Sequence, residues 1–284
     1  MTQLRTAPAV PETASSPVMD QFREHVRKAT GISLSDAKAS MIHQRLRRRV
    51  VEVGFQTTDD YLRQVMSARD GAEMVRAVDL ITTNTTSFFR EPQHFDFLAK
   101  RVVPEAIARR GRPRIKIWSA ACSEGAEAYT AAMVLAEQQR MGQSFDYAIL
   151  GTDISTRILD KANRAIFLSD QLEGIPADLR SRYVMSASDP AYAGRGRMVP
   201  ELRRKVRFGQ LNLMDANFPV DPDVTVVFLR NVLIYFDRSD QTRVVQNIAR
   251  HIMRGGYLMV GHSESMVVEH PELRQVMPSV FQKV

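Results

Sequence analysis

The stretch IKIWSAACSEGAEAY, residues 115–129, constrains the fold more than any other part of the chain. It passes from an apolar, β-branched run into a helical pattern across one turn of small residues, which predicts a buried strand leading directly into a helix. Small side chains from Ser119 to Gly125 would let a ligand approach the backbone, where the first amides of the helix point. The turn is not a G-x-G-x-x-G sequence, so an ordinary strand-to-helix turn is an equal alternative on this segment alone.

Length and composition predict a folded protein of about two domains. The chain has 284 residues, of which 44% are hydrophobic and 25% charged. No apolar run reaches the roughly 18 to 20 residues of a membrane span, and the first residues lack the apolar core of a signal peptide, so we expect a cytoplasmic protein without membrane insertion. The only cysteine is Cys122, and the six histidines show no H-E-x-x-H spacing, so no metal is suggested.

The formal charge of +7 suggests an anionic partner, but the excess is local. One cluster consists of Lys38, Arg45, Arg47, Arg48 and Arg49, with no acid between them. The other consists of Arg195, Arg197, Arg203, Arg204, Lys205 and Arg207, against Glu201 alone. Two small basic patches suit an acidic protein surface as well as a phosphate backbone.

The first part of the chain predicts a tail, a small helical domain and a connector. Residues 1–17 are rich in Pro, Ala, Ser and Thr and are expected to be disordered. Residues 18–80 show no strand pattern, and Gly31, Gly54 and Gly71 each follow a stretch of helical length, which predicts about four helices. Residues 81–92 form a polar linker with two phenylalanines and an arginine, either anchored to the core or folded over a ligand.

The second helix of that domain carries an apolar stripe beside part of the first basic cluster. Ser33 or Ser35 would open it, and its stripe consists of Ile42, Leu46, Val50 and Val53. At 100° per residue Lys38, Arg45 and Arg49 fall within about 40° of one another at the edge of the stripe, while Arg47 points away. A charge run is about as often a solvated helix face, but this alignment favours a docking surface for an acidic helix or phosphates.

Residues 93–284 alternate between strand and helix patterns, which predicts an α/β domain with a mostly parallel sheet. We expect strands near 115–120, 146–152, 205–212, 224–230, 256–262 and 279–283. Helices are expected at about 92–109, 125–140, 155–164 and 238–253. The alternation lapses at about 170–204, which predicts an inserted β-subdomain. Asp153 ends the second strand, where a Rossmann-like sheet uses an acid to bind ribose hydroxyls.

Several segments, in order, resemble one family. TTNTTSFFRE (82–91), WSAACSEGAEAY (118–129), GTDIS (151–155), NLMD (212–215), LRNVLIYFD (229–237) and GGYLMVGHSES (255–265) are similar to the bacterial chemotaxis receptor glutamate O-methyltransferases, the CheR family. GISLSDAKASMIHQRLRRRV, in the helical part, resembles the family's smaller domain. The resemblance covers about residues 20–284. It implies a Rossmann-like methyltransferase domain with a small inserted β-subdomain, preceded by an all-α domain.

The resemblance also implies a reaction and its residues. S-adenosylmethionine would donate a methyl group to receptor glutamates, giving glutamyl methyl esters and S-adenosylhomocysteine, without a metal. Arg90 and Tyr235 would lie near the transferring methyl and the carboxylate. Asp153 would hold the ribose. The implied donor-binding residues are Asn84, Thr86, Arg90, Glu127, Asp153, Asn212, Leu213, Leu229, Arg230 and Asn231.

The implied partner is the cytoplasmic helical bundle of chemotaxis receptors, in sensory adaptation. Its acidic helix faces would dock on Lys38, Arg45, Arg48 and Arg49. A receptor C-terminal peptide is a second candidate partner, through the β-subdomain. We expect no nucleic acid, and a monomer.

The chain departs from the family at one place. The family usually has G-E-E-P-Y where this chain has Gly125, Ala126, Glu127, Ala128 and Tyr129, so the first acid and the proline are absent. Glu124 stands where threonine is common, and whether it offsets Ala126 is open. A donor-sensing regulator without turnover is therefore one rival. A nucleic-acid methyltransferase is another, but LRNVLIYF stands where its N/D-P-P-Y/F loop would be.

The chemistry of the reactants agrees with the implied reaction. A glutamate with a reference pKa near 4.3 is ionised at pH 7, so displacement at a sulfonium methyl needs no strong base. The enzyme would orient the carboxylate and remove its water. Arg90 would orient more than neutralise, and Tyr235 would donate to the oxygen that does not attack.

Two residues invite other functions that we reject. Cys122 has no obvious base, so its thiol predicts buried packing rather than a nucleophile. Trp118 lies in the apolar run of its own strand and predicts sheet packing rather than base stacking.

Overall fold

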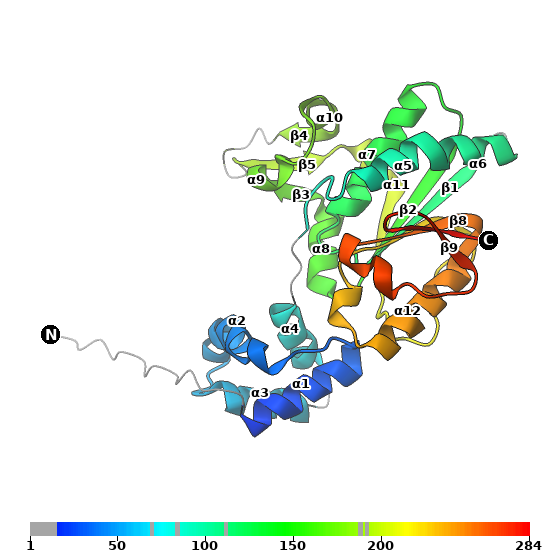
Figure 1. The fold of residues 1–284 in the computed structure, drawn as a ribbon. Coiled ribbons are helices and arrows are strands. Elements are labelled where there is room, and N and C mark those ends of the chain that lie inside the picture. The colour runs from blue at the N-terminus through cyan, green and yellow to red at the C-terminus, as the bar shows by residue number, and fades with distance from the viewer. Residues whose placement is uncertain (1–15, 69–70, 83–85, 111–112, 187–189, 191–192) are drawn as a thin grey trace. The chain divides into compact units, whose positions relative to one another are not determined.

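The computed structural model describes residues 16–68, 71–82, 86–110, 113–186, 190 and 193–284. The chain divides into two compact units, residues 1–83 and 84–284 (Figure 1), and each is considered by itself. Asn84 and most of the predicted tail lie outside the described residues. No helix in the described part of the chain is long and apolar enough to cross a membrane.

The first unit consists of helices. They are α1 (Pro17–Thr30), the short 3₁₀ helix η1 (Asp36–Lys38), α2 (Ala39–Glu52), α3 (Thr58–Ser67) and α4 (Ala72–Ile81). Ser16 caps α1, because its hydroxyl accepts from the Met19 amide, and Pro17 occupies the first turn. Ser16 and Pro17 therefore begin the first helix, and the tail prediction was wrong for these two residues.

The core of this unit confirms the apolar stripe of α2. Ile42, Leu46 and Val50 are fully or almost fully buried, and Val53 packs at the edge of the same cluster. The core takes further side chains from α1, α3 and α4. The stripe thus fixes which side of α2 faces the core.

The second unit contains a seven-stranded sheet in the order β6-β2-β1-β7-β8-β10-β9. The strands are β1 (Arg114–Ala120), β2 (Asp146–Asp153), β6 (Val206–Gln210), β7 (Val224–Leu229), β8 (Ile252–Val260), β9 (Leu273–Met277) and β10 (Val280–Lys283). Pairing is parallel from β6 through β8 and antiparallel at β10 and β9. The mostly parallel sheet predicted from the alternation is confirmed.

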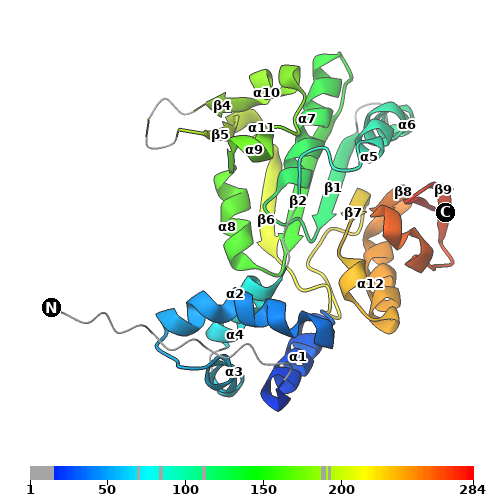
Figure 2. The same ribbon diagram turned by 60° about the vertical axis from the view of Figure 1, so that its left-hand side comes forward.

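Helices cover both faces of this sheet. They are α5 (Gln93–Phe97), a π-helical segment η2 (Leu98–Val102), α6 (Val103–Arg110), α7 (Ala126–Arg140), α8 (Thr156–Arg164) and α12 (Arg238–His251). α7 packs on β1, β2 and β6, α8 on β2 and β6, and α12 on β8 (Figure 2). Ile117 and Trp118 point to opposite faces, as neighbours in a strand must.

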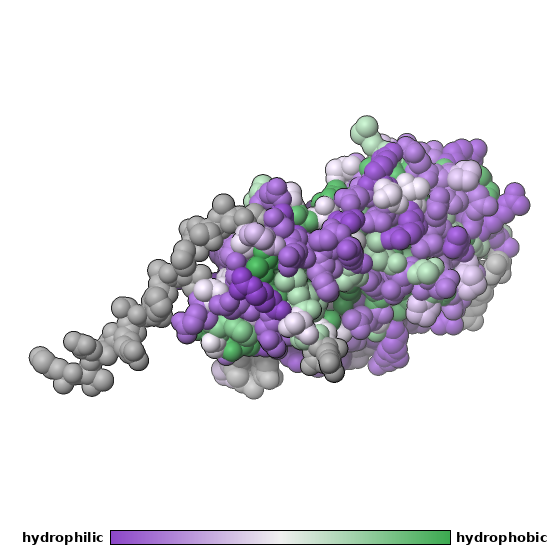
Figure 3. All heavy atoms as spheres, turned by 90° about the horizontal axis from the view of Figure 1, so that it is seen from below, coloured by the Kyte–Doolittle hydropathy of each residue, from purple (hydrophilic) through white to green (hydrophobic). Residues whose placement is uncertain are grey.

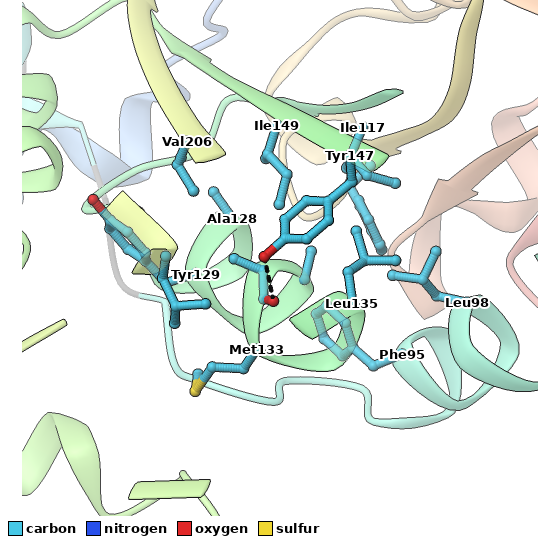
Figure 4. Close-up of a cluster of buried hydrophobic side chains, with 14 of the residues drawn as sticks. Phe95, Leu98, Ile117, Ala128, Tyr129, Met133, Leu135, Tyr147, Ile149 and Val206 are labelled. Atoms are coloured by element: carbon cyan, nitrogen blue, oxygen red, sulfur yellow. Dashed lines mark hydrogen bonds between the residues drawn. The ribbon is translucent and has the colours of Figure 1, made fainter. Parts of the chain in front are cut away.

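The core between α7 and the sheet is shown in Figure 4. Ile117, Tyr147 and Ile149 of the sheet meet α7 there, with Phe95 and Leu98 completing the cluster. The Tyr147 hydroxyl donates to the Ala132 carbonyl at 3.3 Å, so the one polar atom of this aromatic side chain is satisfied inside the core. On the other face Trp118 packs edge-on against His251 of α12.

Three details differ from the sequence expectation. The inserted sheet, in the order β3-β5-β4, begins before residue 170, because β3 covers Ile166–Leu168; β4 is Val184–Ser186 and β5 Arg195–Met198. Strand β9 was not expected, because its partly exposed residues show no apolar alternation. The helix expected at 92–109 is interrupted by η2, and the insertion and loops contain α9 (Ser169–Leu172), α10 (Ala177–Tyr183), α11 (Pro200–Lys205), η4 (Leu233–Tyr235) and η5 (His262–Val267).

Candidate functional site

The carboxyl ends of the central parallel strands form the candidate site. β1 lies between β2 and β7, and Ala120 pairs with both Thr152 and Leu229. The chain leaves β1 toward β2 on one side, while β7 leads to β8 on the other. Such a reversal of strand order opens a crevice at the carboxyl ends of the strands, and ligands of open α/β sheets bind there.

The turn after β1 has an unusual backbone. Ala121 and Ser123 have positive φ angles of 58° and 52°, and Gly125, which precedes α7, has a φ of 87°. The Cys122 amide donates to the Thr152 carbonyl at 2.8 Å, so β2 holds this turn in place. Left-handed conformations of side chains other than glycine are uncommon and cluster at functional sites.

Asp153, at the end of β2, is tied to that turn. It is 7% exposed, and its two carboxylate oxygens accept from the amides of Ser123 at 2.9 Å and Ser155 at 3.1 Å. Ser155 also caps α8 by accepting from the Ile158 amide. Backbone amides thus fix the orientation of the carboxylate that was predicted to hold a ribose.

Arg230, the residue after β7, joins three segments. Its guanidinium donates to Glu127 Oε2 of α7 at 2.9 Å and lies 3.3 Å from Glu91 Oε2. It also donates to the backbone carbonyl of Arg90. The other Glu127 oxygen accepts from the Ser119 hydroxyl at 2.6 Å. The side chain of Arg230 is only 3% exposed, so this is a buried cation between two carboxylates.

The same cluster contains buried polar atoms without a hydrogen-bond partner among the described residues. They are Arg230 Nε, Glu91 Oε2 and both ring nitrogens of His94. His94 is fully buried, and burial, together with the nearby Arg230 cation, lowers its pKa to about 4, so the ring is neutral at pH 7. Because buried polar groups are normally paired, water or polar ligand atoms would be expected to contact these atoms.

The structure places the other predicted site residues as follows. Thr86 is partly buried, and the Arg90 side chain is exposed in the same connector. Leu229 is fully buried and Leu213 is 7% exposed. Asn212 accepts from the Met214 amide at 3.0 Å, which shapes the loop after β6. The half-buried Tyr235 ends η4, while Asn231 has a φ of 58° and donates its amide to Glu264.

Four residues of this region were missed by the sequence reasoning: Ser119, Glu91, His94 and Glu264. Glu264 and Glu91 lie within segments that carry the family resemblance, but nothing in the sequence distinguishes a buried carboxylate from an exposed one. A charged residue just beyond a parallel strand, as Glu264 is beyond β8, is the one signal that was available.

The burial and contacts of Cys122, Trp118 and Glu124 bear on three other expectations. Cys122 is 2% exposed and burial raises its thiol pKa well above the usual value, which confirms the packing interpretation. Trp118 is fully buried, which confirms sheet packing. Glu124 accepts from Lys161 at 2.7 Å and Gln171 at 2.8 Å, so its carboxylate is engaged with α8 and the insertion.

Part of the predicted docking surface is engaged inside the helical unit. Arg45 donates to the carbonyls of Ile81 at 2.7 Å and Thr82 at 2.9 Å. Arg49 pairs with Glu73 at 2.7 Å. Arg48, by contrast, is 92% exposed and pairs only along its own helix, with Glu52, among the contacts of the described residues. Lys38 is partly buried at the end of η1.

No group of three or more His, Cys, Asp or Glu side chains in the described ranges is arranged to hold a metal ion. The pocket outlined between α6 and the amino-terminal ends of β1, β7 and β8 lies at the opposite end of the strands from this site.

Two family models match the chain. The model described as CheR methyltransferase, SAM binding domain, matches residues 84–281. The model described as CheR methyltransferase, all-alpha domain, matches residues 18–82. These ranges correspond to the two compact units.

Curated relatives match over most of their length. The chain is 36% identical over 263 residues to chemotaxis protein methyltransferase 2 of Pseudomonas aeruginosa, with 92% of this chain and 91% of the relative covered. It is 34% identical over 258 residues to the chemotaxis protein methyltransferase of Borreliella burgdorferi, with 89% of each covered. For the Escherichia coli chemotaxis protein methyltransferase the identity is 33% over 240 residues, covering 84% of this chain and 81% of the relative.

Proposed function

This chain belongs to the CheR methyltransferase family, and on that premise we propose that it transfers a methyl group to glutamate side chains of chemotaxis receptors. It is an S-adenosylmethionine-dependent methyltransferase. The observation that carries the assignment of the site is the buried cluster of Glu127, Arg230 and Glu91 at the carboxyl end of the sheet. The products would be glutamyl methyl esters and S-adenosylhomocysteine.

The residues at the strand ends fit S-adenosylmethionine. Arg230 Nε is buried and has no hydrogen-bond partner among the described residues, Glu91 Oε2 has only its ion-pair contact to Arg230, and Asp153 presents an oriented carboxylate beside a turn of small side chains. When bound, S-adenosylmethionine supplies an electrophilic methyl group on a sulfonium. The residues that would hold it are Asn84, Thr86, Arg90, Glu127, Asp153, Asn212, Leu213, Leu229, Arg230 and Asn231.

The contacts of Arg230 indicate that Arg230 and Arg90 would have different roles. Glu127, Glu91 and a backbone carbonyl surround the Arg230 guanidinium, so this cation orders the donor site. Arg90 has an exposed side chain and is the cation that would meet the incoming carboxylate. A monodentate contact from Arg90 would orient one oxygen and leave the other to attack, since a bidentate clamp would hold both in the ground state.

Tyr235 would be the second residue that contacts the acceptor carboxylate. It ends the short helix η4 that follows Arg230, and its side chain is half-buried. Its hydroxyl would donate to the carboxylate oxygen that does not attack. No strong general base is needed, because a glutamate is ionised at pH 7. Turnover of Arg90→Ala and Tyr235→Phe tests these roles: a loss of about 10²-fold or more supports them, and unchanged turnover in both contradicts them.

Methyl-labelled S-adenosylmethionine and a receptor cytoplasmic domain test the function itself. Carboxyl methyl esters release labelled methanol in mild base, whereas methyl groups on nucleobases, lysines or arginines stay attached. Base-labile label on the receptor supports the proposal. Base-stable label on nucleic acid would favour the nucleic-acid rival, and donor binding without transfer to several receptors would favour the sensor suggested by Ala126.

The receptor bundle would dock on the outer face of α2. Arg45 and Arg49 are held inside the unit, so the exposed cations Arg47 and Arg48 are the ones that would meet receptor acids. Lys38 lies near the beginning of the same helix. Each exposed charge pair contributes about 0.2 to 1 kcal/mol, so binding would be weak and salt-sensitive. An unchanged Michaelis constant for receptor at high salt would contradict this docking.

A receptor C-terminal peptide would bind the inserted sheet. Leu168 and Met185 are about half exposed on the same face as the basic residues Arg195 and Arg197, because these positions share a parity in the strand register. β3 and β4 are its edge strands, and an extended peptide can add to such an edge. Fusing the peptide to a receptor should lower its Michaelis constant; no change would contradict the assignment.

We also place the protein in the cytoplasm as a monomer, because its proposed substrate is the cytoplasmic part of the receptors. On the face shown in Figure 3, most of the residues are hydrophilic. Light scattering of the purified protein checks the mass, and a dimer at micromolar concentration would contradict the monomer.

A further inference from the structure

The loop after β7 carries several proposed site residues on a strained backbone. Arg230, Asn231 and Tyr235 all lie between the end of the strand and the end of η4. Asn231 has a φ of 58° in this loop. Such a conformation persists only where surrounding contacts hold it. The end of the neighbouring strand lies beside the start of this loop, since Leu229 pairs with Val260 at the end of β8.

Glu264 makes the contacts that hold this loop. Its Oε2 accepts from the amides of Asn231 and Gly261, both at 2.7 Å, and its Oε1 lies 3.4 Å from the Ile234 amide. The side chain belongs to η5, which follows β8, and the residue is 1% exposed. One buried carboxylate thus connects the ends of two adjacent strands to the loop that carries Tyr235.

The space for this carboxylate is shaped by Gly261. A Cβ built there would lie 2.7 Å from Glu264 Oε2 and 2.7 Å from Asn231 Nδ2. Any other residue would therefore push the carboxylate and the Asn231 side chain apart. The glycine is required for close approach rather than for its φ, because its backbone is extended with a φ of −64°.

The electrostatics favour fixed amides as partners of Glu264. Burial raises the pKa of its carboxyl, while the backbone amides of Asn231, Gly261, Ile234 and Leu233 act in the opposite direction. Amides that point at an ionised oxygen stabilise it only when they stay in place. The carboxylate and the loop conformation therefore depend on each other.

We propose that Glu264 is a positioning residue that holds the loop after β7, so that Arg230 and Tyr235 present their side chains to the donor and the acceptor. Its oxygens are turned to the main chain, so it acts through that loop and not on the reacting atoms. The inference rests on the proposed donor site, because Arg230 is taken to hold the donor. The role of Glu264 would also explain why Asn231 keeps its left-handed backbone conformation.

The first measurement is the direct binding of S-adenosylhomocysteine to three purified chains: wild type, Glu264→Ala and Glu264→Gln. We expect Glu264→Ala to weaken binding about tenfold or more and to lower turnover with receptor as well. Glu264→Gln should lie between the two, because one amide oxygen can still accept the two short bonds while its NH₂ cannot accept the third. Glu269→Gln is the matched control, since Glu269 is exposed and pairs with Arg238 at 2.6 Å.

Amide hydrogen exchange separates positioning from simple stability. The Asn231 and Gly261 amides should exchange faster in Glu264→Ala, at a temperature where the β8 amides remain protected. A lower melting temperature with unchanged donor affinity, turnover and exchange at Asn231 would overturn the proposal. If Glu264→Ala does not fold, Gly261→Ala gives the second test, and wild-type donor affinity in that variant would also overturn it.

Different results would contradict the receptor assignment and the role of Glu264. A wild-type chain that binds S-adenosylhomocysteine but methylates no receptor would contradict the receptor assignment, while the Glu264 variants would still be judged by donor affinity and exchange. A wild-type chain that methylates receptors, with Glu264→Ala equally active, would contradict only the role of Glu264.

Discussion

Two arginines, Arg49 in the helical unit and Arg230 in the sheet unit, each bridge elements of their own unit, but their surroundings differ. Arg49 makes a bidentate pair with Glu73, with bonds of 2.8 Å and 2.7 Å, and the Tyr61 hydroxyl donates to the same carboxylate at 2.8 Å. Arg230 touches two carboxylates and a carbonyl, and yet its Nε has no partner among the described residues.

The difference lies in how completely each cluster is satisfied. The guanidinium of Arg49 lowers the pKa of the Glu73 carboxyl, and Arg49 keeps 19% of its side chain exposed. Burial and the Glu73 contact raise the pKa of the Tyr61 phenol. This cluster fastens α2 to α3 and α4 and is complete by itself. The Arg230 cluster is more deeply buried, and its Nε has no hydrogen bond to the residues that the structure describes, which agrees with the donor site proposed above.

Removing Arg230 should have the largest effect. Arg230→Ala leaves Glu127 and Glu91 buried without their cation, so we expect a loss of about 3 to 5 kcal/mol of unfolding free energy and at least about 10²-fold in turnover. Urea unfolding and single-turnover methylation measure the two. A double variant, Arg230→Met with Glu127→Gln, should regain part of the stability, because Glu91 still lacks its cation, but not activity; regained activity would show that the cluster is only structural.

The neutral His94 beside Arg230 makes the stability of the sheet unit depend on pH. The folded pKa is about 4 and the ordinary value is 6.5, so the unfolded chain binds the proton first as pH falls. The stability that the neutral His94 ring contributes is fully present above pH 6.5. It falls by up to about 3 kcal/mol as the pH is lowered toward 4. Urea unfolding over this range, compared with His94→Asn, should show a shallower slope in the variant; equal slopes would contradict a neutral buried ring.

Breaking the Arg49 pair should affect only the helical unit. A double-mutant cycle of Arg49→Ala and Glu73→Ala should give a coupling of about 1 to 3 kcal/mol, since the hydrogen bonds are charge-assisted and partly buried. Affinity for S-adenosylhomocysteine should stay at the wild-type value. If donor affinity fell along with stability, the contrast between a structural and a ligand-binding arginine would be lost.

The smallest effect is expected at Arg48, the neighbour of Arg49 that faces outward. Arg48→Ala should raise the Michaelis constant for receptor by about two- to fivefold at low salt, as one exposed charge pair allows, and by less at high salt. Arg63→Ala is the control, because Arg63 is also exposed and pairs along its own helix with Asp60 at 2.8 Å. An equal change in both variants would point to net charge rather than docking.

The sequence by itself determined the alternation of the main strands and helices of the sheet unit, the buried stripe of α2 and the position of Asp153 at the end of a strand. These follow from local periodicity, which says which face of an element is buried and where it ends. The motifs determined the family for the same reason, because each lies within one short segment. Strand β9 was not predicted, because its side chains are partly exposed and show no apolar pattern.

Only the tertiary structure decided which charged residues work together. Arg49 and Arg48 are adjacent in the chain, and nothing in their spacing tells that one pairs with Glu73, 24 residues away, while the other faces solvent. Arg230 meets Glu127 across 103 residues, and Glu264 reaches the loop of Asn231 across 33. Periodicity predicts whether a side chain points to the core or to solvent. Its partner depends on which elements pack beside it, and that packing is a property of the folded chain alone.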